Sequence, residues 1–249
     1  MNSPELQKQF HEQADLRRFW NRRKNPYLRR KEEELSRRIL GNCDNPQPRL
    51  LEVGCGEGNN LLSLQELNPA AACFGLDFSP AKLRFLREHS PQCLPVCGDA
   101  AALPFKDNRF DLVLLRDLLH HLPWAKETVL RESWRVARPG GRIIVLEGRG
   151  DALLNRIFQR LHPVERGMAE STPANLLSLG ERFTPGASLE FVEASYLLRA
   201  VGFVMGWPEG RMGRIVRPLY RLASWWDLMC AAWLPRRRWT LMMLTLVKD

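Results

Sequence analysis

The feature that most constrains this chain is a glycine-rich stretch at residues 50–61, with the sequence LLEVGCGEGNNL. A short apolar run that contains the acid Glu52 leads into glycines at alternate positions. Because glycine lacks a Cβ and readily adopts positive φ angles, this spacing lets a strand turn sharply while a ligand lies against bare backbone. We therefore predict a strand that ends near Val53 and a helix that begins near Asn59. The glycines of the loop are Gly54, Gly56 and Gly58.

The spacing of these glycines separates two kinds of nucleotide site. A dinucleotide-binding turn needs a third small residue, in the pattern G-x-G-x-x-G or A. Counted from Gly54 and Gly56, that place is taken by Asn59. The order acid, x, Gly, x, Gly, x, Gly instead resembles the first motif of class I S-adenosylmethionine (SAM) methyltransferases. A tight strand-to-helix turn without a ligand is the alternative that this motif alone leaves open.

Downstream of the loop, apolar runs with strand spacing alternate with helical patterns. This alternation predicts a doubly wound α/β sheet with helices on both faces. The predicted strands are residues 72–77, 94–97, 110–115 and 142–148, and the predicted helices between them are residues 80–88 and 124–137.

An acid stands at the tip of the second predicted strand. Asp77 can accept two hydrogen bonds from a ribose diol, which suits a nucleotide cofactor. The alternative role for Asp77 is to cap the next helix, but Ser79 and Pro80 can start that helix themselves. Phe78, beside it, is a further candidate for cofactor contact.

Two longer segments carry a more specific resemblance. Residues 98–122, GDAAALPFKDNRFDLVLLRDLLHHL, and residues 129–148, VLRESWRVARPGGRIIVLEG, resemble small-molecule and quinone-type SAM methyltransferases. The resemblance covers about residues 48–148 and resumes weakly at 189–203. It implies a Rossmann-like sheet of seven strands, mostly parallel with the last strand antiparallel, and SAM as the cofactor.

The same resemblance assigns further residues to the cofactor site. It implies that Asp99 meets the adenine amino group, that the backbone N–H of Ala100 meets a ring nitrogen, and that Arg116 backs the cofactor. The full set of expected cofactor residues is Glu52, Gly54, Gly56, Gly58, Asp77, Phe78, Asp99, Ala100 and Arg116.

Two histidines directly follow the fourth predicted strand. His120 or His121 is a candidate general base, because imidazole titrates near neutral pH. The alternatives are that one histidine caps a turn or packs in the core, and that transfer proceeds by proximity alone. Residues 116–119 lack the proline-rich turn of enzymes that methylate base amines, and no cysteine follows the strand, so we expect no nucleic-acid substrate.

We divide the chain into a helical extension at residues 1–47 and a methyltransferase domain at residues 48–249. Insertions at about 149–188 and 208–238 leave from strand ends on the cofactor side of the sheet, where α/β proteins bind ligands. We therefore expect both insertions to lie over the active site and to build the acceptor pocket. The sixth strand is predicted near 203–207 and the last at 240–247.

The second insertion combines tryptophans with arginines. Residues 211–238 place apolar side chains mostly three or four apart, with arginines around them. Such a segment suits a helix in a bilayer interface, and it equally suits a lid over an apolar acceptor. An amphipathic helix packed on the core is the third reading. The tryptophans are Trp225, Trp226 and Trp233.

Composition limits the location and the partners. The net charge of +9 fits a solvated surface or attraction to an anionic partner. The six cysteines form no C-x-x-C pair, so we expect reduced thiols and no metal site. The first residues are too charged for a signal peptide, and no apolar run approaches the roughly 20 residues of a spanning helix. We expect a cytoplasmic protein, with possible peripheral contact to a membrane surface through 211–238.

These observations favour SAM-dependent methyl transfer to a small, hydrophobic or lipid-linked biosynthetic intermediate, with an oxygen as the favoured acceptor atom. A membrane-associated protein that binds SAM without catalysis is the alternative from another class. Methylation of protein or RNA is a minor alternative.

Overall fold

The computed structural model describes residues 4–12, 16–206 and 213–249. Its centre is a seven-stranded sheet with the order β3-β2-β1-β4-β5-β7-β6. β7 runs antiparallel to both of its neighbours, and the other paired strands are parallel, which confirms the predicted Rossmann-like sheet. The strands are β1 (Arg49–Val53), β2 (Ala72–Asp77), β3 (Leu94–Cys97), β4 (Phe110–Arg116), β5 (Ala137–Gly148), β6 (Ser188–Glu193) and β7 (Leu241–Val247).

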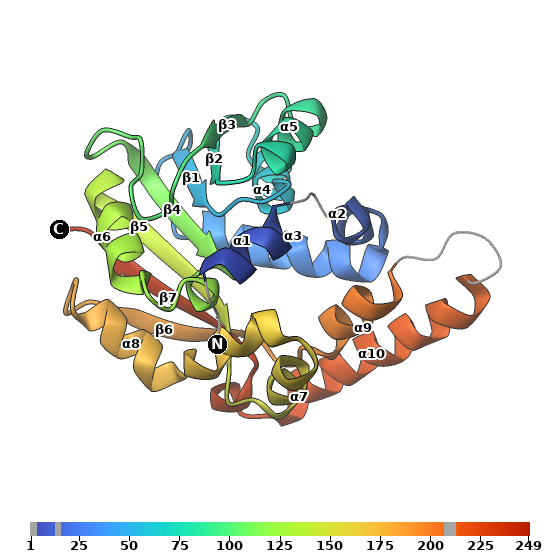
Figure 1. Cartoon of the computed structure of the whole chain (residues 1–249). Coiled ribbons are helices and arrows are strands. Elements are labelled where there is room, and N and C mark those ends of the chain that lie inside the picture. Colours follow the sequence, from blue (N-terminus) through green and yellow to red (C-terminus); the bar gives the residue numbers. More distant parts are fainter. Residues whose placement is uncertain (1–3, 13–15, 207–212) are drawn as a thin grey trace.

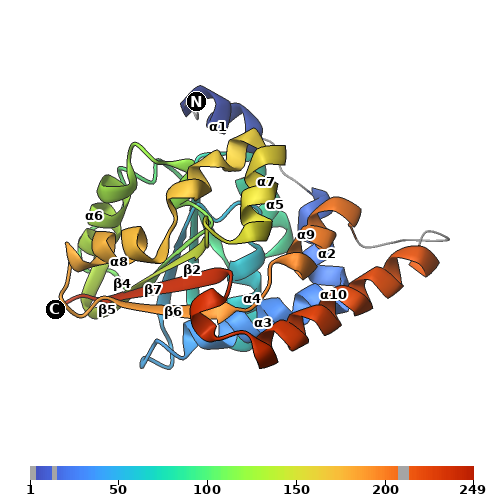
Figure 2. The ribbon, with the colours of Figure 1, turned by 90° about the horizontal axis from the view of Figure 1, so that it is seen from below.

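Helices cover both faces of this sheet, as Figures 1 and 2 show. The α-helices are α1 (Pro4–His11), α2 (Leu16–Lys24), α3 (Pro26–Leu40), α4 (Asn59–Leu67), α5 (Pro80–His89), α6 (Lys126–Val136), α7 (Leu153–Leu161), α8 (Pro173–Glu181), α9 (Leu197–Met205) and α10 (Gly213–Trp233). Short 3₁₀ helices are η1 (Leu119–His121), η2 (Pro163–Glu170) and η4 (Arg236–Arg238).

The core forms two apolar layers because strand side chains point alternately to opposite faces. In β1, Leu51 and Val53 join the layer under α6 and α8, whereas Leu50 joins the layer under α3, α4 and α5. β4 is buried along its whole length. Its continuous apolar run, Phe110–Leu115 around a single Asp111, is typical of a central parallel strand.

The N-terminal extension forms three helices, α1, α2 and α3. Pro26 separates α2 from α3 and begins α3, where its fixed φ and missing N–H cost nothing. Asn25 caps this helix, since its side-chain oxygen accepts a hydrogen bond of 3.0 Å from the N–H of Tyr27.

The predicted sixth strand at 203–207 is wrong. Residues 203–205 belong to α9, and residue 207 lies outside the described residues. The sixth strand is β6, in which Leu189 and Phe191 pack on the core and Glu190 faces solvent, as period-two spacing requires. Gly202 allows α9 to approach α3, since a Cβ there would lie 2.7 Å from Leu28 Cδ1. Close helix packing therefore decides the conformation of a segment whose local sequence also suits a strand.

With β6 at 188–193, one long connection precedes this strand and another follows it. Residues 149–187 link β5 to β6 through α7, η2 and α8, and residues 194–240 link β6 to β7 through α9, α10 and η4. Among the described residues, no helix has both the length and the apolar character needed to cross a bilayer.

Candidate functional site

The glycine loop between β1 and α4 has positive φ angles at all three glycines, but they serve different purposes. Gly54 and Gly58 allow close packing, because an added Cβ would lie 2.7 Å from Leu118 Cδ1 and 2.2 Å from Leu86 Cδ1. Gly56, with φ of 55°, has no atom within 4 Å of the position a Cβ would take. Only Gly56 therefore presents bare backbone to open space.

Asp77 ties the glycine loop to the end of β2. One carboxylate oxygen accepts a hydrogen bond of 2.8 Å from the N–H of Gly56, and the other accepts one of 2.9 Å from the N–H of Ser79. Burial raises the pKa of Asp77, and Lys82 together with these two N–H groups opposes the rise. The side chain also faces the cavity described next, so it combines a structural contact with access to a ligand.

A cavity of about 610 Å³ lies at the carboxyl ends of β1, β2 and β4. It brings together most of the residues expected from the sequence. Those that line it are Gly54, Gly56, Asp77, Phe78, Asp99, Ala100, Arg116, His120 and His121. Two expected cofactor residues, Glu52 and Gly58, do not line it. Gly58 faces the core, and Glu52 lies behind the loop.

Glu52 is a buried carboxyl that supports the loop from behind. It accepts a short hydrogen bond from the side-chain amide of Asn60, and its Oε2 atom has no hydrogen-bond partner among the described residues. Burial raises the pKa of Glu52 to about 8, against the opposing effects of Asn60 and Arg116. Glu52 is therefore largely protonated at neutral pH.

Arg116, at the end of β4, anchors the N-terminal extension to the sheet. Its guanidinium donates to both carboxylate oxygens of Glu32 on α3, at 2.5 and 3.1 Å. Arg199 on α9 also binds Glu32, at 2.5 Å. Burial alone would raise the pKa of Glu32, but the charges of Arg116 and Arg199 hold it well below its ordinary value. Arg116 thus lines the cavity while its charge is neutralised by a segment far away in sequence.

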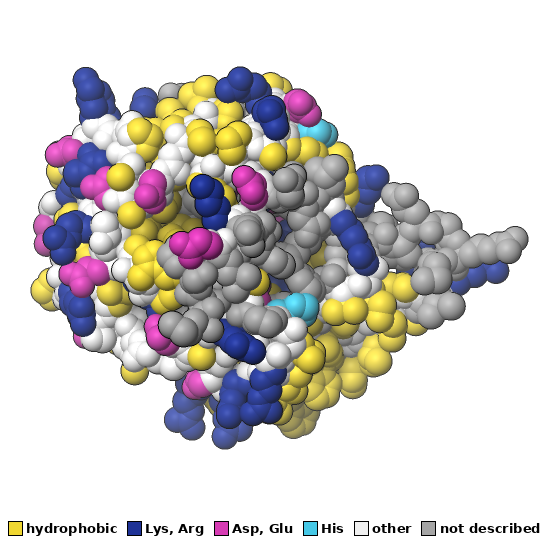
Figure 3. Space-filling view, in the orientation of Figure 1, with side chains coloured by type: hydrophobic (Ala, Val, Ile, Leu, Met, Phe, Trp, Pro, Cys, Tyr) yellow, Lys and Arg dark blue, Asp and Glu magenta, His cyan; other side chains and the backbone are white. Residues whose placement is uncertain are grey.

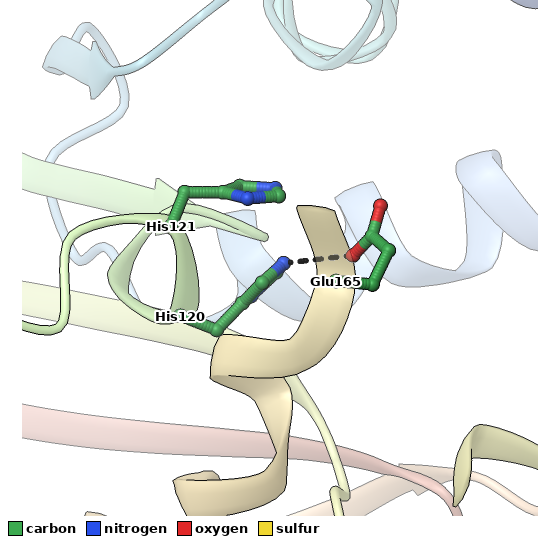
Figure 4. Close-up of side chains that lie close together, drawn as sticks. All are labelled: His120, His121 and Glu165. Carbon is green, nitrogen blue, oxygen red and sulfur yellow. Dashed lines mark hydrogen bonds and ion pairs between the residues drawn. The ribbon is translucent and has the colours of Figure 1, made fainter. Parts of the chain in front are cut away.

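His120 on η1 lies between two carboxylates, and Figure 4 shows its contact with one of them, Glu165. Its Nδ1 lies 2.5 Å from Glu147 Oε2 on β5, and its Nε2 lies 3.2 Å from Glu165 Oε2 on η2. Burial works to lower the pKa of His120, but the two carboxylates raise it well above its ordinary value. The two carboxylates therefore favour the protonated form of His120, in which both ring nitrogens donate.

His121 occupies the cavity wall beside His120. The two ring centroids are 3.9 Å apart, and the ring of His11 on α1 meets His121 edge to face at 4.5 Å. One ligand atom each from His120, His121 and Glu165 lies within 4.8 Å of the others, a spacing that could hold a metal ion. We interpret the cluster as an ion-paired one, because both nitrogens of His120 already bind carboxylates.

The walls of the cavity correct one expectation about the insertions. The first insertion contributes Glu165 and Met168 of η2. The second contributes no lining residue within its described part, 213–238. Instead, α10 packs on α9 and α3, where Val216, Tyr220 and Ala223 are buried. Residues 207–212 lie outside the described residues.

No sequence motif marks the cavity residues of the N-terminal extension. Gln7, His11 and Arg22 line the cavity, and Gln7 also bonds the carbonyl of Val164 at 2.9 Å. Tyr196 and Arg199, after β6, complete the same side. Charged and aromatic residues in a helical pattern are ordinary surface features, so only the tertiary fold reveals their place.

Comparison with known proteins gives consistent results. Residues 51–145 match the family described as methyltransferase domain. A demethylmenaquinone methyltransferase of Anoxybacillus flavithermus is 36% identical over 118 residues, which are 45% of this chain and 48% of that protein. The chain thus spans about half the length of this curated relative.

Other relatives share more of the chain. A fatty-acid O-methyltransferase of Mycolicibacterium smegmatis is 32% identical over 182 residues, 67% of this chain and 66% of that protein. A protein of Encephalitozoon cuniculi named as a methyltransferase is 31% identical over 153 residues, 60% of this chain and 69% of its own length.

A solved structure shares the fold over nearly the whole chain. The plantazolicin methyltransferase BpumL, in complex with a triazolic desmethylPZN analog and SAH, has a TM-score of 0.62 and 15% identity, and the match covers 98% of this chain and 95% of that one. By sheet order, motif and relatedness, the chain belongs to the class I SAM-dependent methyltransferases.

Proposed function

We propose that the chain transfers the methyl group of SAM to a small, hydrophobic or lipid-linked acceptor, with a hydroxyl or carboxylate oxygen as the favoured receiving atom. One observation carries the proposal. A single cavity joins the open backbone at Gly56 and the acids Asp77 and Asp99 to an end lined by His121 and apolar side chains. We place this activity in the cytoplasm.

The residues at the first end of the cavity fit SAM. Gly56 leaves room for a ligand against the backbone. Asp77 uses one lone pair of each oxygen on backbone N–H groups, and a carboxylate has further acceptor sites for a ribose diol. Phe78 is 40% exposed and offers an apolar ring beside it. Asp99 and Ala100 lie at the end of β3, where they would meet the adenine.

Replacing Asp77 by alanine tests this placement. We expect the affinity for SAM to fall by about 1–3 kcal/mol, roughly 5- to 150-fold, because charge-assisted hydrogen bonds to SAM are lost and the Gly56 N–H loses its acceptor. Calorimetric titration would measure the change. Asp44→Ala is a matched control, since Asp44 is an exposed acid away from the cavity. Unchanged affinity in the Asp77 variant would contradict the ribose assignment.

The other end of the cavity suits an apolar acceptor. Besides Leu118, which packs against Gly54, the apolar lining residues include Leu122 and Trp124, close to His121 in the chain, and Met168 of η2. A fatty acid and a quinone ring are the acceptors that the names of two relatives indicate, and both are hydrophobic. Bound SAM supplies an electrophilic methyl group, so the protein has to align the acceptor with it and exclude water.

His121 is our candidate for the base that accepts a hydroxyl proton. Both histidines line the cavity, but the two ring nitrogens of His120 are each bound to a carboxylate, Glu147 and Glu165. We assign His120 and Glu165 a positioning role, since together they fix η1 and η2 across the acceptor end.

Turnover of methyl-labelled SAM tests the function as a whole. The protein is incubated with labelled SAM and with fatty acids, reduced quinones or a lipid extract, and label is followed into the organic phase. Transfer to these acceptors supports the proposal. SAM binding without transfer would favour the non-catalytic alternative, and label in protein or RNA would favour the minor one.

A lipid-linked acceptor would be met at a bilayer, so we propose, separately from methyl transfer, a peripheral membrane contact through residues 211–238. Helix α10 would form only one part of the protein surface that contacts the membrane.

A further inference from the structure

Helix α7 is folded with its polar side inward and its apolar side outward. Asn155 and Gln159 are buried and donate to the carbonyls of Arg149 and Gly150, at 2.9 and 3.0 Å. Leu153 and Leu161 point outward and are 73% and 70% exposed. A surface helix ordinarily buries its apolar face. Packing among the described residues therefore does not account for the outward leucines.

Helix α10 also has an apolar face that the other described residues leave exposed. Val216, Tyr220 and Ala223 face α9 and α3. A neighbouring stripe at spacings of three, four and seven residues is exposed, with Trp233 at 78%. This stripe consists of Leu219, Leu222, Trp226 and Trp233.

Arginines border both exposed faces. Arg217 and Arg221 stand exposed on a third side of α10, and Arg156 and Arg160 are exposed on α7. α7 contains no acid, and the single acid of α10, Asp227, is ion-paired with Lys31. The exposed arginines of η4 add to this charge. Within the described residues, α7 and α10 thus carry exposed arginines and no exposed acid of their own.

The two helices lie on the same side of the molecule. The view from below shows α7 and α10 both turned toward the reader, with α9 between them (Figure 2). α9 adds the exposed side chains Val204 and Met205. In the space-filling view, hydrophobic side chains gather along α10, with basic side chains beside its lower end (Figure 3). We call the outward apolar faces of α7 and α10, with their arginines, the docking surface.

We propose that the docking surface binds an anionic lipid bilayer, with the leucines of α7 and the tryptophans of α10 entering the interface together. Exposed apolar patches of this kind mark interaction sites, and indole and guanidinium groups both favour the boundary between lipid and water. A second copy of the chain is a poorer occupant, because a symmetric contact would place like-charged arginine borders against each other.

The position of α7 links this surface to the cavity. η2 follows α7 directly in the chain and carries Glu165 and Met168 into the cavity wall. A bilayer bound at α7 would therefore lie next to the acceptor end. Docking itself needs no methyl transfer, so it can be tested independently of the proposed function.

The experiment is flotation with vesicles of phosphatidylglycerol and phosphatidylcholine, or of phosphatidylcholine alone. We expect the protein to float with the anionic vesicles at low salt, and to float less with neutral vesicles or in high salt. The α7 variant is Leu153→Gln with Leu161→Gln, and the α10 variant is Trp226→Gln with Trp233→Gln. Each should lower the vesicle partition coefficient by about tenfold or more.

Two controls match these variants. Leu94→Gln removes a leucine that is 52% exposed on β3, away from the docking surface. Arg84→Gln with Arg87→Gln on α5 is compared with Arg217→Gln with Arg221→Gln on α10, and only the α10 pair should reduce binding. All variants should bind S-adenosylhomocysteine as the parent does, which shows that the fold is intact.

Several outcomes would overturn the proposal. One is failure of the parent protein to float with anionic vesicles at any salt concentration. Another is binding that both leucine and tryptophan variants retain in full. A third is a stable dimer, measured by light scattering, that the same variants dissociate, since this would identify a second copy as the occupant. Because none of these readouts uses methyl transfer, failure here leaves the proposed function standing.

Discussion

Replacing Glu32 by glutamine is expected to destabilise the fold by about 3–5 kcal/mol, because it leaves buried guanidinium groups without their shared counter-charge. Glu32 is 4% exposed and binds Arg116 and Arg199 together. Glutamine keeps the shape of the side chain, so the loss reports charge rather than volume. Urea denaturation at neutral pH would measure it.

The matched control is Glu34→Gln on the same helix, where the partner Arg30 is exposed. That pair should be worth less than about 1 kcal/mol. The pKa of Glu32 is lowered in the folded state. Its ionised form therefore adds to the free energy of unfolding above the ordinary carboxyl pKa, and this stabilisation is lost as the pH falls through the lowered pKa of the folded state. The difference between parent and variant should therefore shrink in acid. If the Glu32 and Glu34 variants lost the same free energy of unfolding, the stabilising role of the ion pairs from Glu32 to Arg116 and Arg199 would be contradicted.

His121→Ala is expected to lower turnover by about 100-fold or more, if His121 takes the proton from a hydroxyl acceptor. The affinity for SAM should stay nearly the same, since His121 lies at the acceptor end of the cavity. Turnover of labelled SAM and calorimetric titration of SAM, with His89→Ala on α5 as the control, provide the two measurements.

Full activity in the His121 variant would dismiss the base assignment and favour proximity alone. Dialysis against EDTA tests whether the site holds a metal ion. The parent rate should not change, because the ring nitrogens of His120 are bound by Glu147 and Glu165. A loss of activity that a divalent metal restores would instead mean that His120, His121 and Glu165 hold an ion.

The sequence predicted those parts of the fold that depend on local patterns. The strands at 72–77 and 94–97 were predicted with the observed bounds, and the helix after the glycine loop begins at the expected Asn59. Gly56 and Asp77 come together because their strands are neighbours in the sheet, which strand order alone dictates.

The parts that sequence analysis missed depend on contacts between distant segments. His11 reaches His121 only because α1 packs against η2 and the cavity. Arg116 was expected to back the cofactor, yet its charge is bound to Glu32, 84 residues earlier in the chain. The apolar run at 203–205 is helical because Gly202 lets α9 approach Leu28. No local pattern encodes these pairings.

The most direct test of the whole account is a crystal structure of the chain with S-adenosylhomocysteine. We predict the nucleoside between Asp77 and Asp99, its chain passing over Gly56, and its sulfur turned toward His121. An empty cavity, or the nucleoside bound elsewhere on the protein, would contradict the account.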